Sequence, residues 1–138
     1  MKEEIITFET AKLAKDSGFQ IPCKSKFVVL KTKIVEKTNS THNANSKKDN
    51  VYARPTQTLL QKWLREKHNI YAKTHPVYKN GKVMYEFIIF LLNKRLGEYG
   101  FKNLMSINIE PYYWEMDEEA LEKALQEGLK LIKTNDGL

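Results

Sequence analysis

The stretch "IYAKTHPVYKNGKVMYEFIIFLL", residues 70–92, decides the fold of this chain. Asn80-Gly81 is the dipeptide that a two-residue type I′ turn prefers, and runs rich in β-branched and aromatic residues flank it on both sides. Such a turn makes Lys79 face Lys82 and defines the partner of every residue before and after them. The stretch therefore predicts an antiparallel hairpin with a known register.

That register divides the side chains of the hairpin between two faces. The apolar face, which is expected to belong to the core, carries Ile70, Ala72, Thr74, Pro76, Tyr78, Val83, Tyr85, Phe87, Ile89 and Leu91. The other face is mixed, so we expect it to be partly exposed and partly covered, and it places His75 opposite Glu86. Pro76 cannot donate a ladder hydrogen bond, which predicts a sheet edge or a bulge at its strand.

The stretch just before the hairpin, "ARPTQTLLQKWLREKHN" at residues 53–69, predicts an amphipathic helix. Pro55 suits the first helical position, where its missing N–H would have no partner, and Asn69 suits the left-handed position after the last turn. The apolar stripe, which is expected to be buried, consists of Leu59, Leu60, Trp63 and Leu64. Packing thus explains the apolar residues of the helix, whereas the role of its polar residues is not explained by packing.

The part of the chain after the hairpin predicts three segments. Residues 93–103 are typical of a loop, and the alternation from Leu104 to Tyr112 indicates a half-buried strand. Residues 116–133 predict the strongest helix, in which Gly128 is expected to allow close packing on an aromatic residue such as Trp114. The expected core stripe of this helix is Ala120, Leu121, Ala124, Leu125, Gly128, Leu131 and Ile132.

The part of the chain before residue 53 also predicts three segments. Thr7 is a good N-cap for a helix from Phe8 to about Ser17, and Gly18 supplies the left-handed position after it. Residues 26–37 predict one strand, because β-branched and aromatic side chains dominate them. Residues 38–50 have too little apolar surface to offset the entropy of ordering them, so we expect a mobile loop.

These elements predict an α+β fold with the order α-β-α-β-β-β-α. The strands are expected to form one mainly antiparallel sheet of about four strands, a meander that includes the Asn-Gly hairpin, and the three helices are expected to cover it. The expected organisation is a single domain over residues 1–138.

Composition narrows the class of protein. The chain has 138 residues, of which 41% are hydrophobic and 29% charged, as expected of one soluble domain of ordinary size. It has a single cysteine and no N-terminal pattern of a secretory signal, and its longest apolar run, Phe87 to Leu92, is too short to cross a bilayer. These features predict a cytoplasmic protein that does not associate with a membrane.

The charges are distributed unevenly along the chain. The net charge of +6 is made of +11 over residues 1–109 and −5 over residues 110–138. A basic body can attract polyanions, or the basic and acidic parts can pack on each other within one chain or between two copies. The mixed face of the hairpin and the acidic C-terminal end give a small basic domain two ways to pair with a copy of itself, which predicts a homodimer.

Three stretches resemble a group of small uncharacterised proteins that phages and prophages of gut bacteria encode. They are "ETAKLAKDSGFQIPCKS" at residues 9–25, "YARPTQTLLQKWLREKHNI" at 52–70 and "EEALEKALQEGLKLI" at 118–132. The middle stretch, of the type P-T-Q-x-L-L-Q-x-W-L-R-E, is the most specific, and the likeness leaves out residues 38–50 and 93–103. The resemblance implies a phage or prophage context and no mechanism.

The sequence predicts neither an enzyme nor a cofactor or metal site. Cys23 would need a base such as His68 or His75 to act as a nucleophile, and neither lies near it in the sequence, so a half-buried structural thiol is favoured. The histidines show no metal-ligating spacing. His75 and Glu86 are expected to form a cross-strand pair that is either structural or part of a pocket.

The favoured function is that of a small accessory or protein-interaction module, with a protein partner or a second copy of itself. The alternative is a nucleic-acid-binding protein that uses a basic surface around the helix at 55–68 and the hairpin at 70–91. The candidate nucleic-acid contacts are Lys47, Lys48, Arg54, Lys62, Arg65 and Lys73. Nucleic acid is the less favoured partner, because a loop precedes this helix and a hairpin follows it, so the two-helix unit of a helix-turn-helix motif is missing.

Overall fold

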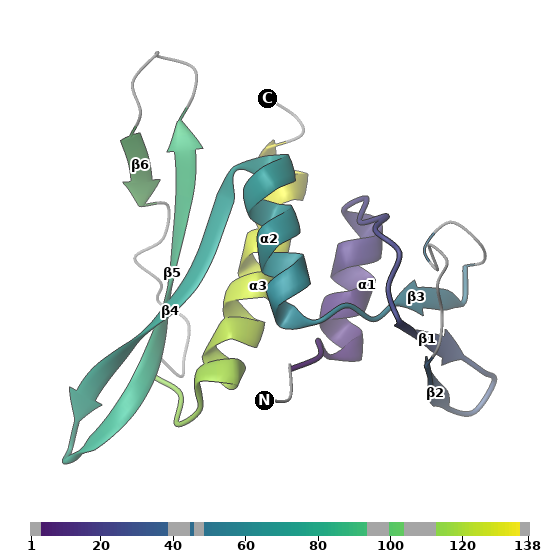
Figure 1. Ribbon diagram of the computed structural model, residues 1–138, viewed down its shortest axis with the longest axis horizontal. Coiled ribbons are helices and arrows are strands. Elements are labelled where there is room, and N and C mark those ends of the chain that lie inside the picture. The colour runs from purple at the N-terminus through teal and green to yellow at the C-terminus, as the bar shows by residue number, and fades with distance from the viewer. Residues whose placement is uncertain (1–3, 39–44, 46–48, 94–99, 104–112, 136–138) are drawn as a thin grey trace. The chain divides into compact units, whose positions relative to one another are not determined.

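The computed structural model describes residues 4–38, 45, 49–93, 100–103 and 113–135 (Figure 1). The chain divides into two compact units, unit 1 over Met1–Leu60 and unit 2 over Gln61–Leu138. The boundary falls inside helix α2 (Gln57–His68), and each unit is described by itself. The expected single domain over the whole chain stays a prediction.

Unit 1 begins with helix α1 (Phe8–Asp16), whose two ends form as predicted. The Thr7 side chain accepts a hydrogen bond from the backbone N–H three residues further on. Gly18 has a φ of +90°, and the N–H of Phe19 donates to the carbonyl oxygen of Ala14 at 3.0 Å. This is the Schellman arrangement, and it ends the helix with the Phe19 ring fully buried.

The sheet of unit 1 has three antiparallel strands, in the order β2-β1-β3. They are β1 (Ser25–Val29), β2 (Ile34–Thr38) and β3 (Val51–Ala53). The prediction of one strand over residues 26–37 is wrong, because the chain reverses between Leu30 and Lys33, where the N–H of Leu30 donates to the Lys33 carbonyl oxygen at 2.8 Å. That turn contains no glycine, proline or asparagine, so the usual turn signal was missing.

The predicted loop at residues 38–50 lies largely outside the described residues. Asn45 is described, and its side chain makes two hydrogen bonds within unit 1. Its Nδ2 donates to the carbonyl oxygen of Phe19 at 2.8 Å, and its Oδ1 accepts from the N–H of Ala53 at 2.8 Å. One asparagine thereby connects the end of α1 with strand β3.

Helix α2 ends as predicted but starts two residues late. The N-cap is Thr56, whose hydroxyl oxygen accepts from the N–H of Leu59 at 3.1 Å, so Pro55 precedes the cap and the prediction that it begins the helix is wrong. Asn69 has a φ of +57°, the left-handed conformation predicted for it. The chain therefore leaves α2 abruptly and enters the hairpin at the next residue.

Unit 2 contains the predicted hairpin, with the predicted register confirmed pair by pair. Its strands are β4 (Ile70–Lys79) and β5 (Lys82–Asn93), and Asn80 and Gly81 in the turn have φ values of +51° and +83°. Strand β6 (Gly100–Asn103) pairs with the end of β5, so the order is β4-β5-β6 and the prediction of a loop throughout 93–103 is wrong. The strand predicted at 104–112 lies outside the described residues.

The hairpin is buried near its root and exposed near its turn. Ile70, Ala72, Phe87 and Ile89 are buried, whereas Tyr78 and Val83 on the same face are exposed. The prediction that this whole face belongs to the core therefore holds only for the root.

Helix α3 (Asp117–Asn135) lies along the hairpin and packs against β4 and β5 (Figure 1). A Cβ on Gly128 would lie 3.4 Å from side-chain atoms of both Ile70 and Leu64. The glycine therefore allows close packing of these two aliphatic side chains, whereas the sequence had suggested close packing of Trp114. Trp63, Phe87 and Leu125 are all buried in this unit, as predicted. Leu129, which the predicted stripe omitted, is also fully buried.

The α+β class is confirmed, and so are the three helices. The prediction of one sheet of about four strands in the order α-β-α-β-β-β-α is not confirmed, since the described strands form two sheets in the order α-β-β-β-α-β-β-β-α. The added strands are short, and β3 has only 3 residues, too few for any alternation to be read. Among the described residues, no helix has the length and apolar character needed to cross a membrane.

Candidate functional site

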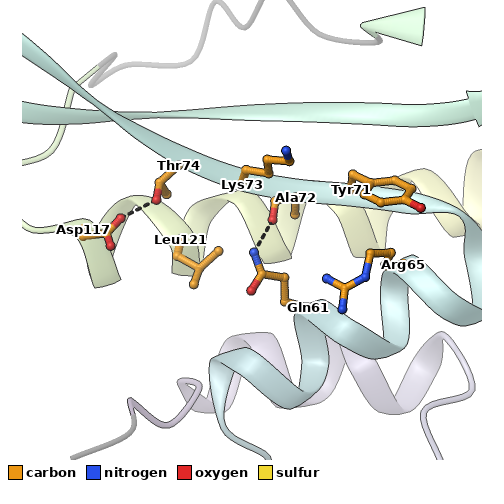
Figure 2. Close-up of a pocket in the computed structure, with 8 residues that line it drawn as sticks. All are labelled: Gln61, Arg65, Tyr71, Ala72, Lys73, Thr74, Asp117 and Leu121. Carbon is orange, nitrogen blue, oxygen red and sulfur yellow. Dashed lines mark hydrogen bonds between the residues drawn. The ribbon is translucent and has the colours of Figure 1, made fainter. Parts of the chain in front are cut away.

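Unit 2 contains a pocket of about 370 Å³ bounded by α2, β4 and the start of α3 (Figure 2). The residues that line it are Gln61, Arg65, Tyr71, Ala72, Lys73, Thr74, Asp117 and Leu121. It is large enough for a small organic molecule or for a few atoms of a peptide.

Two local features of the sequence build the walls of this pocket. Asn69 reverses the chain directly after α2, so β4 runs back beside the helix that precedes it. Gln61 and Arg65 are four residues apart on α2 and therefore lie on the same side of it. The Gln61 Nε2 donates to the carbonyl oxygen of Ala72 at 2.7 Å, which joins the helix to the strand across the pocket.

The edge of β4 beside the pocket lacks two of the backbone groups that an added strand would bind. The two-residue turn makes Lys79 and Lys82 a hydrogen-bonded pair, and hydrogen-bonded and non-hydrogen-bonded pairs alternate along β4 from there. The backbone N–H and C=O groups of the non-hydrogen-bonded residues Ala72, Thr74 and Pro76 therefore point away from β5. Gln61 already occupies the Ala72 carbonyl oxygen, and Pro76 has no N–H. Among the described strands β4 lies at the edge of its sheet, which is one of the two alternatives predicted for Pro76, and the missing N–H of Pro76 interrupts the row of outward donors there.

The pocket has opposite charges at its two ends. Arg65 lies at one end and Asp117 at the other, where the Asp117 carboxylate accepts a hydrogen bond from the Thr74 hydroxyl (Figure 2). Lys73 contributes little charge, since its ammonium points away from Gln61 and Arg65 and lies 6.0 Å from the centre of the Phe90 ring. Within the described part of the chain, no acidic side chain forms an ion pair with Arg65.

A second surface of unit 2 lies at the turn of the hairpin. Tyr78 is 74% exposed and its cross-strand partner Val83 is 52% exposed. Pro76, two residues before Tyr78 and on the same face, is exposed as well. These three residues form what we call the tip patch.

Residues 113–115 support the hairpin near the tip patch. The Lys82 Nζ lies 2.7 Å from the Glu115 Oε1, and this hydrogen bond together with the lysine charge lowers the pKa of Glu115. The Lys79 Nζ lies 4.8 Å from the centre of the Tyr113 ring. The backbone N–H groups of Tyr85 and Trp114 each donate to the carbonyl oxygen of the other, at 2.7 and 2.8 Å. The tip patch is therefore exposed on a hairpin that is held in place.

Four of the six candidate nucleic-acid contacts are among the described residues, one of them in unit 1 and three in unit 2. Lys47 and Lys48 lie outside those residues. Arg54 belongs to unit 1, where its Nη2 lies 3.0 Å from the Glu36 Oε2 and its guanidinium lies over the Phe27 ring.

The three remaining candidates belong to unit 2. Lys62 lies 3.9 Å from the Glu66 Oε1, one turn further along α2. Arg65 and Lys73 both line the pocket, although only the guanidinium points toward the other lining side chains. The pocket thus unites two of the six predicted contacts.

The predicted cross-strand pair of His75 and Glu86 forms, with the His75 Nε2 2.6 Å from the Glu86 Oε1. The pair does not line the pocket described above and lies on the opposite face of the hairpin from the tip patch.

Cys23 lies in unit 1 and is buried. Its thiol donates to the carbonyl oxygen of Ile21 at 3.3 Å, and burial raises its pKa to about 11. Such a thiol is almost entirely protonated at neutral pH and is a poor nucleophile. In the described residues, no cluster of three or more His, Cys, Asp or Glu side chains could hold a metal ion.

The sequence reasoning singled out two pocket residues and missed most of the others. Arg65 and Lys73 were chosen for their charge, whereas Thr74 and Asp117 are 43 residues apart and no spacing rule connects them. The one available signal was the polar flank of α2, where Gln61 and Arg65 recur at a spacing of four.

Comparison of the chain with family models, with curated proteins and with solved structures finds no match in any of the three. The phage or prophage context that the resemblance implies therefore stays a prediction.

Proposed function

We propose that this protein is a small interaction module without catalytic activity, and that it binds a second copy of itself through the tip patch. The exposure of Tyr78 and Val83 at the end of a supported hairpin is the observation that carries the proposal. Apolar side chains grouped on the surface of a small protein mark interaction sites more often than solitary ones do.

The support behind the hairpin favours binding. Because the Lys82–Glu115 ion pair and the Tyr85–Trp114 hydrogen bonds already hold the tip, little conformational freedom is lost when a partner binds. Tyrosine also provides a large contact area with few rotatable bonds.

The charges around the tip patch are compatible with a second copy as the partner. In a twofold contact the same residues meet from both copies, so Lys79 and Lys82 would come close to their own counterparts. Within one chain, the Lys82 charge is balanced by Glu115 and the Lys79 ammonium lies over the Tyr113 ring. These contacts reduce the repulsion that two pairs of lysines would otherwise cause.

Sedimentation velocity over a range of protein concentrations tests this proposal. We expect the wild-type chain to dimerise with a Kd on the order of 10 µM, as is typical of a small interface, and Tyr78→Ser to remain monomeric at the same concentrations. Leu30→Ser is the matched control, because Leu30 is an exposed apolar residue of unit 1 outside the tip patch, and it should dimerise like the wild type.

Two results would contradict the proposal. One is a single species of 16.2 kDa for the wild type at the highest concentration. The other is a dimer that Tyr78→Ser leaves unchanged, since the contact would then lie elsewhere.

A further inference from the structure

We infer that the pocket of unit 2 binds a carboxylate that is carried on an apolar group, such as a small organic acid or the carboxyl end of a peptide. This inference goes beyond the proposed function and does not depend on the tip patch. It rests on Arg65, on its neighbour Gln61 and on the apolar floor between them and Asp117.

Arg65 supplies the positive charge that would hold the carboxylate. Its guanidinium is directed along the pocket (Figure 2), and no acidic side chain of the described residues forms an ion pair with it. Asp117 accepts a hydrogen bond from Thr74 at the far end, and Glu66 on the same helix lies 3.9 Å from the Lys62 ammonium. A guanidinium offers two parallel N–H groups, which match the two oxygens of a carboxylate.

Gln61 adds a neutral donor on the same side of α2. Its side-chain amide has two N–H groups, and one of them donates to the Ala72 carbonyl oxygen. The bond to Ala72 fixes the amide beside Arg65 and leaves the second N–H for a ligand oxygen. Leu121 and the methyl group of Ala72 provide the apolar surface on which the rest of the ligand would pack.

The charges of the pocket favour a carboxylate over a phosphate. A phosphate with two negative charges is matched best by two or more cations, and here the Lys73 ammonium points away from the pocket. Asp117 at the far end would repel a doubly charged ligand more strongly than a singly charged one. One guanidinium and one amide suit a group with a single charge and two oxygens in a plane.

Titration of the ¹⁵N-labelled full chain, followed by NMR, tests the inference. The probes are sodium hexanoate, inorganic phosphate, and a hexapeptide that ends in leucine with either a free or an amidated carboxyl group. We expect hexanoate and the free-carboxyl peptide to shift the Gln61 side-chain amide signals saturably, with a Kd of about 1 mM or tighter. Phosphate and the amidated peptide should bind at least tenfold more weakly.

Variants of α2 decide whether Arg65 holds the ligand. Arg65→Gln should weaken hexanoate binding at least tenfold, and Arg65→Lys, which keeps the charge without the paired N–H groups, should weaken it by a smaller factor. Lys62→Gln is the matched control, because it removes a positive charge from the same helix outside the pocket, and it should bind like the wild type. The backbone amide spectrum shows whether each variant is folded. If Arg65→Gln is not folded, the binding measured with Arg65→Lys serves as the test instead.

Comparison of hexanoate with the free-carboxyl peptide distinguishes a small organic acid from the carboxyl end of a peptide as the ligand. Tighter binding of the free-carboxyl peptide than of hexanoate would assign the pocket to a protein terminus, and the reverse order would assign it to a small acid. The inference is overturned if neither probe gives saturable shifts at ~20 mM, if phosphate binds more tightly than hexanoate, or if Lys62→Gln weakens binding as much as Arg65→Gln does. Tyr78→Ser should keep hexanoate binding, so this result and the dimerisation result can fail separately.

Discussion

At the scale of single residues, the residue type found at each backbone position with an unusual conformation suits that conformation. Asn69, Asn80, Gly18 and Gly81 have positive φ values, and each stands where a helix ends or a hairpin turns. Asparagine and glycine adopt this conformation at lower cost than other residues. For this reason the ends of α1 and α2 and the turn of the hairpin were all predicted correctly from the sequence.

Cys23 carries a prediction at this scale. Because burial raises the pKa of its thiol from 9.0 to about 11, the thiolate fraction at neutral pH is far lower than that of an exposed cysteine. Alkylation by iodoacetamide at pH 7.5 should be at least about tenfold slower in the native chain than in urea, even allowing for the greater nucleophilicity of a more basic thiolate. Mass spectrometry follows the reaction, and equal rates in both states would contradict the burial of this thiol.

The same residue should make the protein sensitive to alkaline pH. The folded state holds the Cys23 proton more tightly than the unfolded state, so the stabilising contribution is complete below pH 9.0 and is lost as pH rises toward about 11. Denaturation of Cys23→Ala over this range is the control, and it should show a smaller alkaline loss of stability than the wild type.

At the scale of elements, the packing of α3 on β4 depends on one position. Gly128 costs the helix about 1 kcal/mol relative to alanine, and an added Cβ would meet side-chain atoms of Ile70 and Leu64 at 3.4 Å, the lower limit of ordinary van der Waals contact. We therefore expect Gly128→Ala to change the free energy of unfolding by between zero and about 1 kcal/mol in the stabilising direction.

Gly128→Val provides the contrast for that prediction. A β-branched side chain fills more space than the two neighbours leave, so this variant should lose on the order of 1–3 kcal/mol. Urea denaturation of both variants measures the difference. A loss from Gly128→Ala as large as that from Gly128→Val would mean that the helix and strand cannot separate at all at this point.

The elements also show where sequence reasoning works and where it fails. The hairpin register was predictable because Asn80-Gly81 allows one turn geometry, and that turn fixes every pair behind it. The reversal at Leu30–Lys33 was missed because four ordinary residues form it. The pocket was missed for another reason, since Thr74 and Asp117 meet only once α3 packs on the hairpin.

At the scale of the whole molecule, the net charge of +6 alone does not make a nucleic-acid-binding protein. Arg54 pairs with Glu36, Lys62 with Glu66, and Lys82 with Glu115, so several basic side chains are already matched. Surface ion pairs of this kind are weak individually, yet each one places a negative charge beside a basic side chain. The interaction module accordingly remains the favoured function.

A salt titration against single- and double-stranded oligonucleotides tests that choice. We expect no binding at about 50 mM salt and micromolar protein, where phosphate contacts are strongest. Saturable binding that weakens with salt would instead support the alternative function. In that case Lys62→Ala combined with Arg65→Ala should flatten the log–log slope by about 2, one for each lost phosphate contact.

The guarded edge of β4 has a consequence for how copies of this chain can assemble. Gln61 occupies the outward carbonyl oxygen of Ala72 and Pro76 has no N–H, so two of the backbone groups that an added strand would bind along this edge are missing. A contact through the tip patch, in contrast, uses up the same surface on both copies. Association through the tip patch would therefore stop at two copies, because neither copy keeps that surface for a third.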